Sequence, residues 1–298
     1  ARAEELDALV VLTPTPDHHR DVQEALKRGV SVICEKALTT DSHSAWAIAR
    51  KAREARRHCL VTFNYTGYPA VREMRRQIQQ GLIGDLIQIA IEMPQESFLR
   101  AGAAPQDWRL RDYQLPTVSL DLGVHVVHLA DYLATPGHAT KVVASQQHGG
   151  TVTTVIDNVN SIVEYDSGAV ASFWWSKTAL GHRNGLRVRI FGSERSLEWC
   201  QMSPEDVVIA ARDGTRTILD RGAPSPDSEL ARVRYNRFKA GHPAGFIEAF
   251  ANLYRDFREL LATPVSAHDD DDDNSFSAEK AAQGIELLEH IHRRACDD

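Results

Sequence analysis

A stripe of polar residues interrupts one of the most apolar segments of the chain. Asp121, His125, His128 and Asp131 follow one another at steps of four, three and three, with valines and leucines between them. On a helix, this spacing keeps the four side chains close to one face. A histidine there can exchange a proton near neutral pH, and Asp121, one turn earlier, can orient His125. The stripe therefore predicts an acid–base site centred on His125.

Two other interpretations of the same stripe stay open. Histidine and aspartate at these steps are also plausible ligands for a metal ion. Alternatively, Asp121 caps a helix and the histidines are buried with satisfied hydrogen bonds, because polar groups inside an apolar segment need partners. The residue types and their spacing are compatible with acid–base chemistry, a metal site and a purely structural role.

Further polar residues follow two apolar runs near the start of the chain. Glu35 and Lys36 come directly after the run at 30–34, and the segment 13–18 follows the run at 6–12. Ligands bind at the carboxyl ends of strands in open α/β sheets. Beside a buried strand, Lys36 can keep its charge or act as a base; the alternative is a surface ion pair.

The elements that must position these residues change character along the chain. In the first third, strands are expected at 6–12, 30–34 and 59–63, with helices at 17–29, 42–57 and 69–81. Short links between such elements imply parallel strands with right-handed crossovers. Later strands are expected within 85–93, 157–176, 186–201 and 205–220, and helices at 119–134, 242–262 and 277–295. Turn signals between these strands suit hairpins.

This pattern predicts an α/β protein with two domains. Residues 1–66 form a parallel α/β unit. Residues 67–298 form an α+β domain with a large, mostly antiparallel sheet. The sheet's outer face needs a cover, so a partner is expected there.

Composition narrows the function classes. The 298 residues carry a net charge of −7, which disfavours a nucleic-acid binder. No apolar run reaches the ~20 residues of a membrane span. The four cysteines are scattered, so a reducing cytoplasm is the expected location. The five aspartates at 269–273 are expected to form a solvated loop, because calcium needs spaced ligands and a glycine turn.

Taken in order, the motifs resemble the Gfo/Idh/MocA family, named after glucose–fructose oxidoreductase and inositol dehydrogenase. They are D-A-L-V-V-L-T-P with a later His, E-K-A, F-N-Y, W-R, D-L-G-V-H and G-H-P-A-G-F. The W-R pair before D-L-G-V-H, the segment G-H-R-N-G-L with a later E-W, and G-H-P are most similar to sugar dehydrogenases of the levoglucosan dehydrogenase-like group. The resemblance covers nearly the whole chain. It implies that residues 1–66 are a partial Rossmann-like domain that binds a dinucleotide. It also implies that the open-faced sheet domain, residues 67–298, binds substrate and carries the oligomer contacts.

The resemblance implies an NAD- or NADP-dependent enzyme that moves hydride between the cofactor and a sugar or polyol hydroxyl carbon. Lys36 matches the lysine that contacts the nicotinamide ribose and the reacting oxygen. His125 matches the histidine that takes the hydroxyl proton. Asp121 matches the aspartate that binds substrate and supports the proton relay.

The same resemblance assigns residues around this centre. Cofactor-lining positions are Thr13, Pro14, His18, Glu35, Lys36 and Asn64, with Trp108 and Arg109 closing over the nicotinamide side. Arg183 and Asn184 join Asp121 and His125 as substrate residues. No metal ligand is implied. A homodimer or homotetramer through the open sheet face is expected.

Three features depart from the family pattern. Ala37 replaces the usual proline after E-K, and His128 stands where many members carry an aspartate. No glycine-rich phosphate loop is found, so two strand–helix units, roughly 60 residues, are expected to be missing before Leu6. This departure leaves two alternatives: a non-catalytic binding or scaffold relative without a working cofactor site, and a metal-dependent lyase or isomerase.

Overall fold

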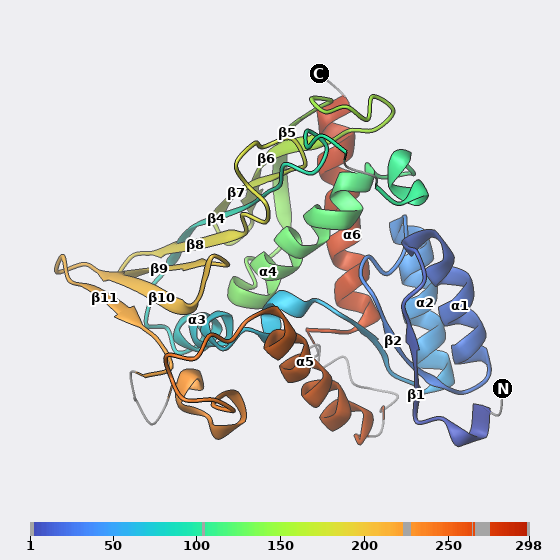
Figure 1. The fold of residues 1–298 in the computed structure, drawn as a ribbon, viewed down its shortest axis with the longest axis horizontal. Coiled ribbons are helices and arrows are strands. Elements are labelled where there is room, and N and C mark those ends of the chain that lie inside the picture. The colour runs from blue at the N-terminus through green and yellow to red at the C-terminus, as the bar shows by residue number, and fades with distance from the viewer. Residues whose placement is uncertain (1–2, 103–104, 223–227, 264, 266–274, 297–298) are drawn as a thin grey trace.

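Two separate β-sheets organise the molecule (Figure 1). The computed structural model describes residues 3–102, 105–222, 228–263, 265 and 275–296. A three-stranded sheet has the order β1-β2-β3, and an eight-stranded sheet has the order β11-β10-β9-β8-β4-β7-β6-β5. The predicted fold class, a partial Rossmann-like unit followed by an α+β domain, is confirmed. The aspartate run at 269–273 lies outside the described residues.

The small sheet is parallel throughout, as the alternation of strands and helices predicted. Its elements are β1 (Ala8–Val11), α1 (Thr15–Lys27), β2 (Ser31–Cys34), α2 (Ser42–Ala55) and β3 (Cys59–Val61). Helix α1 begins two residues earlier than predicted, with Pro16 in its first turn, where a missing N–H costs nothing. Helix α2 begins after Asp41, whose carboxylate accepts a hydrogen bond from the Ser44 amide at 2.7 Å.

The two edges of the small sheet differ. Strand β2 is buried along its whole length, whereas Leu9 and Val10 of β1 are 38% and 42% exposed. On the other edge, the amide of Val61 donates to the carbonyl of Phe276 at 2.8 Å, and Leu60 forms an isolated bridge with Ser277. The segment before the last helix therefore joins the small sheet at β3.

The large sheet is mostly antiparallel. Its strands are β4 (Leu86–Pro94), β5 (Ala139–Gln147), β6 (Asn158–Tyr165), β7 (Val170–Ser176), β8 (Arg187–Gly192), β9 (Arg195–Cys200), β10 (Ser203–Ala211) and β11 (Arg216–Leu219). The hairpins fall at the predicted turns, and only the pair β4–β7 is parallel. Strand β5 was not predicted, because its alternation of buried and exposed residues is carried by small and polar side chains.

Helices cover one face of the large sheet (Figure 1). They are α3 (Pro69–Gln79), α4 (Val124–Ala134) and α6 (Ala278–Cys296), and α6 also packs against α2 of the small-sheet unit. Helix α5 (Phe246–Leu261) packs on the short 3-10 turn η2 (Asn64–Gly67) and begins four residues later than predicted. The core lies between sheet and helices and holds Trp175, Trp199 and Phe173.

The opposite face of the large sheet has no helix among the described elements. Val143, Ile162 and Phe191 are exposed on it, and a groove of about 520 Å³ runs across its middle beside Trp174. Because the two sheets share no strand, we propose that the boundary between the two domains lies near residue 66. None of the described helices is long and apolar enough to cross a membrane.

Candidate active site

The D-L-G-V-H motif forms a widened helical turn. Residues Ser119–Gly123 make a single π-turn, η4, that leads directly into α4. Trp175 of β7 anchors this turn by donating from Nε1 to Ser119 Oγ at 3.1 Å. A Cβ on Gly123 would lie 3.0 Å from both Leu288 and Trp175, so any larger residue there would push the turn away from the sheet and α6 by a few tenths of an ångström. The predicted helix at 119–134 is confirmed, with this local difference.

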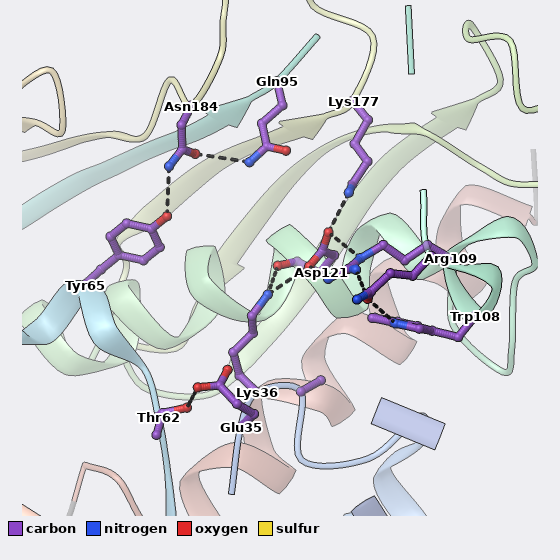
Figure 2. Close-up of polar contacts among 12 residues, drawn as sticks. Glu35, Lys36, Thr62, Tyr65, Gln95, Trp108, Arg109, Asp121, Lys177 and Asn184 are labelled. Atoms are coloured by element: carbon purple, nitrogen blue, oxygen red, sulfur yellow. Dashed lines mark hydrogen bonds and ion pairs between the residues drawn. The ribbon is translucent and has the colours of Figure 1, made fainter. Parts of the chain in front are cut away.

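Three cations surround the carboxylate of Asp121 (Figure 2). Lys36 Nζ donates to Asp121 Oδ1 at 2.9 Å and to its backbone carbonyl at 2.6 Å. Lys177 Nζ donates to Oδ2 at 2.5 Å, and Arg109 reaches both oxygens at 3.3 Å. Burial alone would raise the pKa of Asp121, but the charges of these cations outweigh burial and hold that pKa well below its usual range. Asp121 is therefore ionised.

His125 lies beside this cluster and is buried. The edge of Tyr65 meets its ring, with the ring centres 4.7 Å apart. Burial lowers the pKa of His125 well below its usual value, and the charge of Lys36 lowers it further, whereas Asp121 opposes the shift. The imidazole is therefore neutral at pH 7 and able to accept a proton.

The prediction that Asp121 orients His125 directly is wrong. Both carboxylate oxygens of Asp121 point at Lys36, Lys177 and Arg109, and His125 Nδ1 is buried without a hydrogen-bond partner among the described residues. The cations compete successfully for the carboxylate. The influence of Asp121 on His125 is electrostatic only.

His128 and Asp131, the last two residues of the polar stripe, do not contact the Asp121 cluster. His128 stacks on Phe63 with ring centres 3.7 Å apart, and its Nε2 lies 2.7 Å from the carbonyl of Ser275. Burial lowers the pKa of His128 to about 4. Asp131 pairs with Lys280 at 3.3 Å. His128 is thus packed in the core with one ring nitrogen hydrogen-bonded and its Nδ1 without a partner among the residues that the structure describes. No three His, Cys, Asp or Glu residues in the described ranges are grouped as metal ligands.

Residues predicted to line a cofactor lie at the carboxyl ends of the three parallel strands. Thr13 and Pro14 follow β1 and are exposed, whereas Asn64 follows β3, is buried, and has no partner for its Nδ2. Glu35 follows β2 and accepts a hydrogen bond from Thr62 Oγ1 at 2.7 Å. An unpartnered buried amide at this edge fits a polar ligand there, since such groups are normally satisfied.

His18 connects two of these strand ends. Its Nδ1 lies 2.7 Å from the carbonyl of Ala37, and its Nε2 lies 2.7 Å from the carbonyl of Thr13. The ring is buried beneath the loops that follow β1 and β2. The structure therefore places His18 as a tie between loops, with neither ring nitrogen left for another group.

The predicted residues from the large domain are only partly brought together. Arg109 stacks over the Trp108 ring at 4.4 Å while it contacts Asp121. Asn184 donates to the Tyr65 hydroxyl at 3.1 Å and so reaches the wall beside His125. Arg183 is exposed, and no contact of its side chain with this cluster is found.

Three residues of the site were not predicted. Lys177 follows β7 and is 5% exposed, Tyr65 packs on His125, and Gln95 donates from Nε2 to Asn184 Oδ1 at 3.1 Å. A lysine closing the apolar strand V-A-S-F-W-W-S was the available signal for Lys177. Tyr65 was visible in the F-N-Y motif, without a role of its own.

A lysine at the edge of a parallel sheet, set against a neutral histidine, is the arrangement of a dehydrogenase-type oxidoreductase: one group to accept a proton and one to stabilise charge on oxygen. Two family models match the chain. Residues 1–63 match "Oxidoreductase family, NAD-binding Rossmann fold", and residues 71–198 match "GFO/IDH/MocA C-terminal domain". The chain belongs to the GFO/IDH/MocA family of oxidoreductases, whose cofactor is a nicotinamide dinucleotide.

Curated relatives are similar at low identity. The "Uncharacterized oxidoreductase YfiI" of Bacillus subtilis is 26% identical over 309 aligned residues, which cover 99% of this chain and 77% of that protein. Levoglucosan dehydrogenase of Pseudarthrobacter phenanthrenivorans is 26% identical over 71% of this chain. The aligned region spans 62% of that enzyme and 60% of the scyllo-inositol 2-dehydrogenase (NAD(+)) of Bacillus subtilis.

Solved structures share the fold. An inositol dehydrogenase homolog from Azotobacter vinelandii, complexed with NADH and myo-inositol, superimposes with a TM-score of 0.84 at 24% identity. The superposition covers 98% of this chain and 76% of that homolog. An oxidoreductase from Sinorhizobium meliloti gives a TM-score of 0.82 at 27% identity, with 98% of this chain and 77% of that chain covered.

Proposed function

We propose that this protein transfers hydride between NAD or NADP and the hydroxyl carbon of a sugar or polyol, with His125 as the acid–base residue. The observation that carries the proposal is the neutral, buried imidazole of His125 beside the Lys36–Asp121 pair. The names of relatives support the substrate class: scyllo-inositol 2-dehydrogenase, levoglucosan dehydrogenase and D-apiose dehydrogenase.

The cofactor would be held at the edge where the parallel strands end. Glu35, Lys36 and Asn64 come from this edge, and Trp108 and Arg109 face it from the large domain. The unpartnered Nδ2 of Asn64 fits such a ligand. When bound, the nicotinamide supplies the hydride acceptor.

The residues of the chain handle the proton and the charge. His125 accepts the hydroxyl proton, because its pKa is held low and it is neutral at pH 7. The Lys36 ammonium donates two hydrogen bonds to Asp121, which leaves its third N–H for the substrate oxygen. Negative charge that develops on this oxygen is stabilised by Lys36 at a site largely shielded from water. Asp121 holds Lys36 in place for this task.

The proposal is tested by measuring NADH and NADPH formation with a panel that contains levoglucosan, myo-inositol, scyllo-inositol, common aldoses and the acids of these aldoses. Fluorescence titration with NADH and NADPH runs in parallel. Turnover with one of these polyols or sugars, or with their acids, is expected, together with saturable cofactor binding. Absence of cofactor binding would favour the scaffold alternative. Activity that a chelator abolishes would favour a metal-dependent lyase or isomerase.

We also propose that the open face of the large sheet forms a homodimer or homotetramer contact. The exposed Val143 and Ile162 and the half-buried Trp174 lie together on that face around the groove. A charged substitution, Ile162→Lys, is expected to lower the mass measured by analytical ultracentrifugation. Four free cysteines, two of them buried, support a reducing compartment such as the cytoplasm.

A further inference from the structure

The cluster around Asp121 carries an excess of positive charge. Lys36, Lys177 and Arg109 all contact the single carboxylate of Asp121, and His125 beside them is neutral. Two positive charges remain uncompensated within this group. Proton acceptance by His125 places a positive charge on its imidazole, so the residues of this group remain an excess of cations throughout the proposed reaction.

In the part of the chain that the structure describes, no acid other than Asp121 forms an ion pair with Lys36, Lys177 or Arg109. Glu35 accepts from Thr62, and Glu96 accepts from the amide of Gly181 at 3.0 Å. Both carboxylate oxygens of Asp157 accept from backbone amides, those of Gly149 and Gly150. Among the described residues, Asp121 is the only acid that contacts Lys177, so no second carboxylate of the protein pairs with its ammonium.

Lys177 is the unusual member of the group. Its side chain is buried, yet it donates a single hydrogen bond, to Asp121, and its ammonium lies 5.1 Å from the centre of the Phe98 ring. An ammonium has three N–H donors. A buried cation in surroundings that are already positive is costly unless an anion compensates for it. The remaining donors of Lys177 therefore suit an anionic acceptor.

The opposite wall of the site is polar and uncharged. Tyr65, Asn184 and Gln95 form a connected row of hydroxyl and amide groups (Figure 2). Lys36 and Lys177 reach Asp121 from opposite sides in the same view. Neutral groups of this kind suit sugar hydroxyls, whereas the ammonium of Lys177 suits a carboxylate. The site therefore has a charged end and a neutral end.

We propose that the preferred substrate is a sugar acid or polyol acid, an aldonate or a uronate, whose carboxylate binds Lys177. This inference rests on the dehydrogenase function proposed above. The carboxylate is not altered by the reaction: the carbinol C–H bond breaks, its electron pair leaves with the hydride for the nicotinamide, and the hydroxyl proton passes to His125 as the carbonyl forms. The ion pair orients the carbinol carbon toward His125 and Lys36.

The test compares each acid with its neutral amide, which has nearly the same shape. D-glucuronate and D-glucuronamide, and D-gluconate and D-gluconamide, are titrated into the full chain by calorimetry, with and without NADH. We expect one of the acids to bind about tenfold more tightly than its amide, which is about 1.4 kcal/mol. In Lys177→Met this preference is lost and the amide still binds. In Lys177→Arg, and in the exposed control Lys141→Met, it is kept.

Each outcome decides the question. Equal affinity for acid and amide in the unaltered protein, no binding of either acid, or a preference that survives in Lys177→Met would overturn the proposal. Lys177-dependent binding of the acid without NADH or NADPH formation would keep the carboxylate site at Lys177 and reject the dehydrogenase function. Turnover of neutral polyols without preference for an acid would keep the dehydrogenase function and reject this inference.

Discussion

The two sheets of this protein contribute differently to the site between them. The large sheet packs three helices on one face and carries the fully buried Trp175 and Trp199. The small sheet has only three described strands, and its first strand, β1, is half exposed although the neighbouring β2 is buried. Lys36 comes from the small sheet, whereas Asp121, His125 and Lys177 belong to the large domain. The groups that handle the proton thus belong to the large, better packed domain. The edge expected to hold the cofactor belongs to the small sheet.

Removal of the base on the large-domain side should have the largest effect. In a protein with measurable turnover, His125→Ala is expected to lower kcat by about 10²- to 10⁴-fold, because no neutral imidazole remains to accept the proton. NADH affinity, measured by fluorescence titration, should not change. The matched control is His128→Phe, three residues along the same helix, which should retain most of the turnover. Near-normal kcat in His125→Ala would refute the assigned role.

Removal of the lysine on the small-sheet side should affect both binding and rate. Lys36→Ala is expected to lower kcat/KM by about 100-fold through the loss of a cation at the substrate oxygen. It should also weaken NADH binding, because Lys36 stands at the edge where the strands end. Lys51→Ala, on the surface of α2 in the same unit, is the control. Unchanged steady-state kinetics in Lys36→Ala would count against this division of roles.

The burial of His128 in the large domain should make the free energy of unfolding depend on pH. The pKa of His128 is lowered from 6.5 to about 4 by burial, so the unfolded chain takes up a proton below pH 6.5 that the folded protein resists. The free energy of unfolding should therefore fall by about 3 kcal/mol as the pH drops from 6.5 to 4. His128→Phe, which keeps the stack on Phe63, should remove this part of the loss. Urea titrations across this range measure it, and an identical slope in the variant would contradict the assignment.

The smallest effect is expected at the exposed strand. Val10→Thr on β1 should change the free energy of unfolding by no more than about 0.5 kcal/mol, because Val10 is 42% exposed. The same substitution at Val188 on β8, which is 0% exposed, should cost about 1–3 kcal/mol through a buried hydroxyl without a partner. Equal losses at the two positions would mean that β1 is covered in solution.

Much of the fold could be predicted because its signals are local. The strand–helix alternation, the hairpin turns and the helix over 119–134 follow from patterns a few residues long. Strand β5 escaped, since few of its residues are large and apolar. The parallel pairing of β4 with β7 also escaped, because it joins segments about 80 residues apart and no local pattern specifies a partner at that distance.

Site residues that belong to a sequence motif could be predicted. Those that reach the site only because of how the chain packs could not. Of the residues that the motifs name, Lys36 contacts Asp121, and both His125 and Asn184 contact Tyr65. Lys177 was missed, because strand periodicity shows that a residue follows β7 but not what its side chain reaches. The Asp121–His125 contact was wrongly predicted, because helical spacing does not reveal that cations from three other segments occupy the carboxylate.

The tie made by His18 tolerates sequence change in an unusual way. Both of its acceptors are main-chain carbonyls, those of Thr13 and Ala37, which every amino acid provides. The tie therefore does not depend on the side chains at positions 13 and 37, and alanine in place of the family's proline leaves the acceptor intact. Relatives that keep this histidine should accordingly keep the lengths of the two loops that carry its acceptors.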